Sequence, residues 1–188
     1  MLRKFSQLIV DAIESRASRF AEDRRGVSAV EFAILAPVMV AIYLSSVELS
    51  TGIGIDRKVT ITAGAMASLV SQNQSVSAAD MTNFFNAASS VMAPYSTGTL
   101  KIVVSVLTID STGKVTVSWS KASTGSARTA GSTVTIPSAL AVPSSTLVFS
   151  EVTYGYTPTI GYIISGTLTL SDQMYMSPRQ GTTITYTG

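Results

Sequence analysis

The fold is decided by the stretch Arg24-Arg25-Gly26-Val27-Ser28-Ala29-Val30-Glu31-Phe32-Ala33. It joins a charged N-terminal segment to an apolar one. In the apolar segment, from Val27 to Val47, Glu31 is the only charged residue. As an α-helix, Val27–Leu49 would extend about 34 Å at ~1.5 Å per residue, enough to cross ~30 Å of hydrocarbon. The sequence therefore predicts a transmembrane helix over residues 27–49.

The orientation of this helix follows from the basic residues around it. Arg24 and Arg25 stand directly before the apolar run, whereas only Arg57 and Lys58 lie near its other end. Positive charge flanking a span stays on the cytoplasmic side. We therefore expect residues 1–26 in the cytoplasm and the domain of residues 50–188 outside it, with Arg24 and Arg25 setting the topology.

Glu31 is unusual because a carboxylate inside a membrane span costs about 2.5–3.5 kcal/mol even on a lenient insertion scale. It therefore needs a partner or protonation. Cutting the chain between Gly26 and Val27 would create a free α-amine about one helical turn from Glu31 on a staggered neighbouring copy. Glycine before the cut would let a protease reach the backbone.

These residues resemble a known signal. Gly26, Glu31, Phe32, Ala33 and Pro37 follow a basic pair in the order seen in type IV pilins, and more closely in the TadE-like minor pilins or pseudopilins of tight-adherence (Tad) pili. The resemblance covers about residues 24–50. It implies a leader over residues 1–26 that a prepilin peptidase removes after Gly26. It also implies that Glu31 and Phe32 act in assembly.

The same resemblance implies a structural role in pilus assembly and adhesion, with no enzyme activity and no cofactor. The implied partners are the prepilin peptidase, other pilins, the assembly platform proteins and the membrane. The implied location is the bacterial inner membrane, crossed once, with the C-terminal domain in the periplasm or in an extracellular pilus. Two other functions stay open, an uncleaved membrane-anchored binding module and a tethered hydrolase. A secretory signal cut after Ser45 or Ser46 is a further alternative.

Composition excludes several kinds of site. The chain has neither cysteine nor histidine, which rules out disulfides, thiol nucleophiles, Cys/His zinc sites and a Ser-His-Asp triad. Residues 27–188 carry seven basic and seven acidic side chains, so no basic patch for nucleic acid is predicted. The carboxylates beyond residue 50 stand singly, which predicts neither a metal site nor an acid/base pair; they are Asp56, Asp80, Asp110, Glu151 and Asp172.

Helical patterns precede strand patterns along the chain. An amphipathic helix is expected over residues 2–20, and the long helix should continue from Val27 to about Gln74. The capping-box pattern Ser77-Ala78-Ala79-Asp80 predicts a second helix that ends before Pro94. We expect its buried face to carry Met81, Phe84, Phe85, Ala88 and Val91.

The remaining residues favour an antiparallel sheet. Residues 100–109 are dense in apolar side chains, and Val115, Val117 and Trp119 alternate with polar residues across a turn at 110–113, which predicts a hairpin. Residues 122–132 form a Ser/Thr/Gly/Ala loop. A third strand is predicted over 152–157, alternation is weaker over 162–170, and 182–187 is expected as a last edge strand. The predicted fold class is α+β, pilin-like.

Overall fold

The structure of the chain is a computed structural model that describes residues 25–158 and 166–188. In chain order its elements are α2 (Arg25–Ser71), β1 (Ser75–Val76), α3 (Ala78–Ser90), β2 (Lys101–Ile109), β3 (Val115–Ala122), the short helix η1 (Ser138–Leu140), β4 (Ser145–Tyr156), β5 (Leu168–Met176) and β6 (Thr185–Tyr186). The helix predicted over residues 2–20 lies outside the described residues. The chain divides into two compact units, residues 1–46 and 47–188.

The long helix predicted from the sequence is confirmed as α2, which is continuous through Pro37. Proline removes one backbone N–H donor from a helix, and membrane-spanning helices tolerate it better than helices of soluble proteins do. Among the described residues, one helix is long and apolar enough to cross a membrane, judged by length and composition alone. Up to Tyr43 its large apolar side chains are exposed.

The second unit contains a four-stranded antiparallel sheet in the order β3-β2-β4-β5. The predicted α+β class and the β2–β3 hairpin are therefore confirmed. The turn of this hairpin is held by the Asp110 carboxylate, which accepts hydrogen bonds from the amides of Thr112 at 2.8 Å and Lys114 at 2.9 Å. The third strand, β4, begins at Ser145, earlier than predicted, and the weakly alternating region becomes β5 only from Leu168.

The alternation predicted in β3 is broken by a bulge. Val106 of β2 pairs with Trp119, but the next residue, Leu107, pairs with Val117, which leaves Ser118 as the extra residue. A bulge of this kind turns the following side chains to the other face of the sheet. Val117 accordingly packs on one face of the sheet, whereas Trp119 packs on the other.

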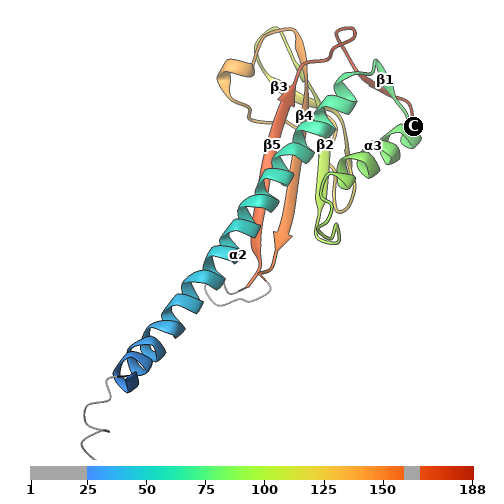
Figure 1. Cartoon of the computed structure of the whole chain (residues 1–188). Helices are drawn as coiled ribbons and strands as arrows, with labels where there is room; N and C mark the ends of the chain where they lie inside the picture. The colour runs from blue at the N-terminus through green and yellow to red at the C-terminus, as the bar shows by residue number, and fades with distance from the viewer. Residues whose placement is uncertain (1–24, 159–165) are drawn as a thin grey trace, which may run out of the picture. The chain divides into compact units, whose positions relative to one another are not determined.

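Two apolar clusters result, one on each face of the sheet. The larger joins the sheet to α2 and α3 and centres on fully buried residues, which include Val59, Met66, Val70, Ile102, Val104 and Val148. Figure 1 shows the later part of α2 running beside the sheet in this unit. The smaller cluster contains Leu107, Val117 and Phe149, and the segment after β3 covers it with Val134, Ile136 and Leu140.

The helix α3 begins as its sequence predicts. Ser77 is the N-cap, its hydroxyl accepts from the amide of Asp80, and the Asp80 carboxylate accepts from the amide of Ser77 at 2.9 Å. Met81 and Ala88 are buried, as expected, and Phe84 and Phe85 are partly buried against the main cluster.

The C-terminal strand differs from its prediction. Residues 182–187 do contain a strand, β6, but it is not an edge of the main sheet. It pairs with β1 in a separate two-stranded parallel sheet. The pairing is fixed by backbone bonds from Thr185 to Gln74 and from Thr187 to Val76, each 3.0 Å long, and by burial of Ile184 beneath it.

Candidate functional site

The residues proposed for processing lie at the start of α2. The described part of α2 starts at Arg25, and the peptide bond between Gly26 and Val27 lies within this helix. Gly26 is exposed, and a Cβ atom added there would meet nothing within 4 Å. Val27 is 57% exposed. Arg24 lies outside the described residues. Among the described residues, no other element lies close to Gly26.

Glu31 and Phe32 follow one turn later. Glu31 lies four positions after Val27, which places both on the same side of the helix. Its side chain is exposed, and Phe32 is 67% exposed. Within the described part of the chain no ion pair reaches Glu31; the one that forms there joins Arg128 to Glu151. The carboxylate of Glu31 is thus presented outward from an apolar helix.

Polar side chains later in the apolar run are satisfied within the helix. The hydroxyl of Ser46 donates to the carbonyl oxygen of Ile42 at 2.9 Å, and Ser45 makes the same type of bond to Ala41. Thr51 bonds in the same way to Val47 at 2.9 Å. Bonds of this type suit a helix surrounded by lipid or by other helices, where water cannot supply the partner.

A second carboxylate on α2, that of Glu48, is buried, which was not predicted from the sequence. It is only 5% exposed and lies beside Tyr156, whose hydroxyl donates to the Glu48 carbonyl oxygen at 3.4 Å. Burial raises the pKa of Tyr156, and the charges of Glu48 and Tyr95 add to this shift. The signal was available, because Glu48 falls at helical spacing on the stripe that continues with Ile55 and Val59.

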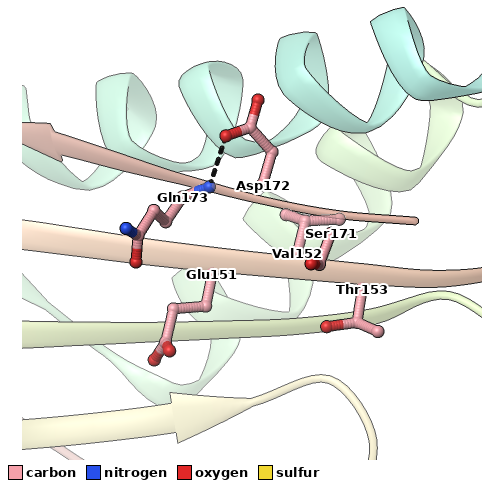
Figure 2. Close-up of a pocket in the computed structure, with 6 residues that line it drawn as sticks. All are labelled: Glu151, Val152, Thr153, Ser171, Asp172 and Gln173. Atoms are coloured by element: carbon pink, nitrogen blue, oxygen red, sulfur yellow. Dashed lines mark hydrogen bonds between the residues drawn. The ribbon is translucent and has the colours of Figure 1, made fainter. Parts of the chain in front are cut away.

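The outer carboxylates do not combine into a catalytic pair. Glu151 and Asp172 both line a shallow cavity of about 470 Å³ on β4 and β5, but they lie on opposite faces of the sheet, as Figure 2 shows. Asp172 accepts from the hydroxyl of Thr60 on α2, whereas Glu151 accepts two bonds of 2.7 Å from Arg128.

Asp110 and Asp80 act locally. Their pKa values are held below the ordinary value chiefly by the hydroxyls of Thr112 and Ser77, respectively, which bond to the charged carboxylates. In residues 25–158 and 166–188, no three acidic side chains come together in a way that could hold a metal ion. The carboxylates of Asp80 and Asp110 hold a helix cap and a turn, and those of Glu151 and Asp172 join different elements of the fold.

One comparison with known proteins finds a family model that matches most of α2. Residues 26–68 match the family model described as TadE-like protein, which confirms the resemblance inferred from Gly26, Glu31 and Phe32. No curated protein and no solved structure matches the chain. The match begins at Gly26 and ends within α2, so it covers the apolar segment and the part of the helix that packs on the sheet.

Proposed function

We propose that this chain is a structural minor pilin or pseudopilin of a Tad-type pilus, processed by a prepilin peptidase after Gly26. The observation that carries the proposal is that the TadE-like match begins at Gly26 itself and runs along α2 to residue 68. The same helix presents an exposed glycine, an exposed Glu31 and a long exposed apolar surface. These are the features that a subunit needs if its helix is first cut and then packed among other helices.

Cleavage and assembly are linked by charge in this proposal. The cut creates an α-amine at Val27, and a neighbouring copy displaced by about one helical turn would bring that amine to Glu31. An ion pair between them would remove the cost of holding the carboxylate in a helix bundle. Phe32, exposed beside it, would add apolar contact between neighbouring helices.

The proposed location follows from the charge distribution. Arg24 and Arg25 hold the leader in the cytoplasm, α2 crosses the inner membrane once, and the domain of residues 50–188 lies in the periplasm or in the pilus. The partners would be the prepilin peptidase, other pilins and the assembly platform. The chain would support pilus assembly and adhesion as a building element, without catalysing a reaction.

A replacement experiment tests the assembly role. The native gene is replaced by versions that encode wild-type chain, Glu31→Gln or Ser28→Ala, and surface pili are counted by electron microscopy. Glu31→Gln keeps the size of the side chain but cannot form an ion pair with an amine, so we expect pilus numbers close to those of the deletion strain. Ser28→Ala, a nearby control, should restore normal numbers. Normal piliation with Glu31→Gln, at equal chain abundance in membranes, would contradict the assembly role.

A further inference from the structure

A cavity of about 540 Å³ is lined by residues of β2, β3 and β4 and by the C-terminal segment of residues 183–186. All of these residues belong to the unit of residues 47–188. Small-molecule sites in proteins have volumes of about 300–1,000 Å³, so the cavity is large enough for a ligand. The proposed function does not use it.

Two neighbouring aromatic rings, those of Trp119 and Tyr186, line this cavity and are held in place. The Nε1 of Trp119 donates to the carbonyl oxygen of Ile184 at 2.8 Å, and the two rings lie 5.6 Å apart with a tilt of 39°. The side-chain nitrogen of Lys121 lies 4.0 Å from the centre of the Tyr186 ring. Rings fixed in this way lose little freedom when a ligand packs against them.

Thr146 on β4 gives independent evidence for a ligand. Its residue is only 7% exposed, and it lines the cavity opposite Thr108 of β2. In the part of the chain that the structure describes, the Thr146 hydroxyl forms no hydrogen bond. A nearly buried hydroxyl without a partner costs free energy, and a ligand that supplies the partner would recover it.

Hydroxyl groups make up the rest of the polar lining. Five lining residues carry one, and they are Thr108, Ser118, Thr146, Thr183 and Thr185. Some of these groups are already in use, because Thr108 and Ser118 share a hydrogen bond and Thr185 donates to the carbonyl oxygen of Gln74 at 3.4 Å. Among the described residues, those of Thr146 and Thr183 have no bond. These two hydroxyls are therefore available to a ligand as both donors and acceptors.

The lining also limits the charge of the ligand. Within the described residues no charged side chain lines the cavity, since Lys121 contacts Tyr186 but is not part of the lining. A phosphate, sulfate or carboxylate would lose water there without gaining a cationic partner. A wholly apolar ligand would cover the Thr146 and Thr183 hydroxyls without bonding to them. The lining therefore favours a neutral ligand that is rich in hydroxyls and apolar on one face.

A peptide strand fits this cavity less well. Bound strands pair through backbone groups, but the Ile184 carbonyl already accepts from Trp119, and the Thr185 amide donates to the Gln74 carbonyl oxygen at 3.0 Å. The contacts that remain are made by side-chain hydroxyls and aromatic rings.

We propose that this cavity binds a neutral saccharide, with a pyranose ring packed against Trp119 and Tyr186 and its hydroxyls bonded to Thr146 and Thr183. One face of a pyranose carries mainly C–H bonds, and their slightly positive hydrogen atoms suit the negative face of an aromatic ring. The hydroxyls at its rim both donate and accept hydrogen bonds. The inference goes beyond the proposed function and does not rest on it, because every lining residue lies beyond residue 100 and none takes part in cleavage after Gly26.

Binding is tested with the full-length chain in a zwitterionic detergent, because detergents with a sugar headgroup would compete for the cavity. The chain is applied to an array of neutral, sialylated and sulfated glycans. The neutral glycan that binds most strongly is then titrated while the fluorescence of the only tryptophan, Trp119, is recorded. We expect saturable binding of at least one neutral glycan with a change in Trp119 emission. No binding, binding of anionic glycans alone, or unchanged Trp119 emission would overturn the inference.

Variants then test the assigned contacts. Thr146→Val keeps the shape of the side chain but removes its hydroxyl, so the affinity for the glycan should fall about fivefold. Its urea midpoint should equal or exceed that of wild type, because an unpartnered hydroxyl is removed. Tyr186→Leu should weaken binding about tenfold, whereas Thr82→Val, at an exposed position of α3, should leave it unchanged.

Undiminished affinity in Thr146→Val, or a lower urea midpoint, would contradict the role given to this hydroxyl. Near-UV circular dichroism shows that each variant is folded before its affinity is compared. Cleavage after Gly26 is read separately by N-terminal sequencing, so a chain that is cleaved but binds no glycan leaves the proposed function standing.

Discussion

Val91 is the C-cap residue of α3, and its carbonyl oxygen accepts a hydrogen bond of 2.8 Å from the side-chain nitrogen of Lys58 on α2. The last carbonyl groups of a helix have no partner inside the helix and carry partial negative charge. Lys58 therefore both satisfies one of these groups and fixes α3 to the long helix.

Replacing Lys58 with methionine should weaken this connection. The variant keeps the apolar part of the side chain but loses the charged donor, and we expect a loss of about 0.5–1.5 kcal/mol in the free energy of unfolding. Urea unfolding of the full chain in detergent, followed by fluorescence of its only tryptophan, Trp119, measures this. Arg57→Met, at the exposed neighbouring position, is the control and should stay within about 0.5 kcal/mol of wild type. Equal stabilities of the two variants would show that the bond to Val91 contributes little.

The indole of Trp119 ties the main sheet to the C-terminal segment. Its Nε1 donates to the carbonyl oxygen of Ile184 at 2.8 Å, and its ring lies 5.6 Å from that of Tyr186. Trp119→Phe keeps an aromatic ring but removes the donor, so the Ile184 carbonyl loses its partner. We expect a loss of about 1–3 kcal/mol, measured by circular dichroism during urea unfolding. Tyr186→Phe, which retains the ring contact, should cost less; the reverse order would be inconsistent with the role given to the indole.

Gly52 lies where α2 passes the ring of Tyr156. A Cβ atom at this position would lie 3.5 Å from Cε1 of Tyr156, an ordinary van der Waals contact. Alanine is therefore expected to fit and to stabilise the helix by about 0.5–1 kcal/mol, because glycine lowers helix propensity by about that amount. Gly52→Leu should destabilise the domain, since its longer side chain must displace Tyr156. Thermal unfolding of both variants tests this, and a lower melting temperature for Gly52→Ala would contradict the packing described here.

The capping box of α3 gives a prediction about pH. The pKa of Asp80 is lowered mainly by the Ser77 hydroxyl, so the folded chain favours the charged carboxylate more than the unfolded chain does. A lowered folded pKa contributes stability above the unfolded pKa, and this contribution disappears as pH falls through the folded pKa, below about 4. Ser77→Ala should raise the Asp80 pKa towards its ordinary value, as measured by NMR titration. Thr82→Ala, further along the helix, should leave it unchanged; an unaltered Asp80 pKa in Ser77→Ala would refute the assignment.

Local sequence signals predicted much of this structure. The apolar run after Gly26, the Ser77–Asp80 capping box and the hairpin around Asp110 each depend on residues close together in the chain, and each formed as expected. The TadE-like match confirms the family resemblance that Gly26 and Glu31 suggested.

Features set by distant contacts were not predictable in the same way. The bulge that turns Trp119 to the opposite face depends on the pairing of β3 with β2, which strand periodicity cannot reveal. The pairing of β6 with β1 brings together residues near 75 and 185, and no local pattern encodes it. The helical spacing of Glu48 with Ile55 and Val59 indicates that it lies on the buried stripe, but the contact with Tyr156 that covers it joins residues 108 positions apart, and no local pattern encodes that contact.

The central claim, that the chain is cut after Gly26 to act as a pilus subunit, is tested most directly by N-terminal sequencing and intact mass of the protein from native membranes. A Gly26→Ala variant is measured beside it. The proposed function predicts a native chain that begins at Val27 and a variant that keeps its leader. A native chain that still begins at Met1 would contradict the proposal and leave an uncleaved membrane anchor that carries the β-domain. A start near Val47 would also contradict it and would indicate a secretory signal instead.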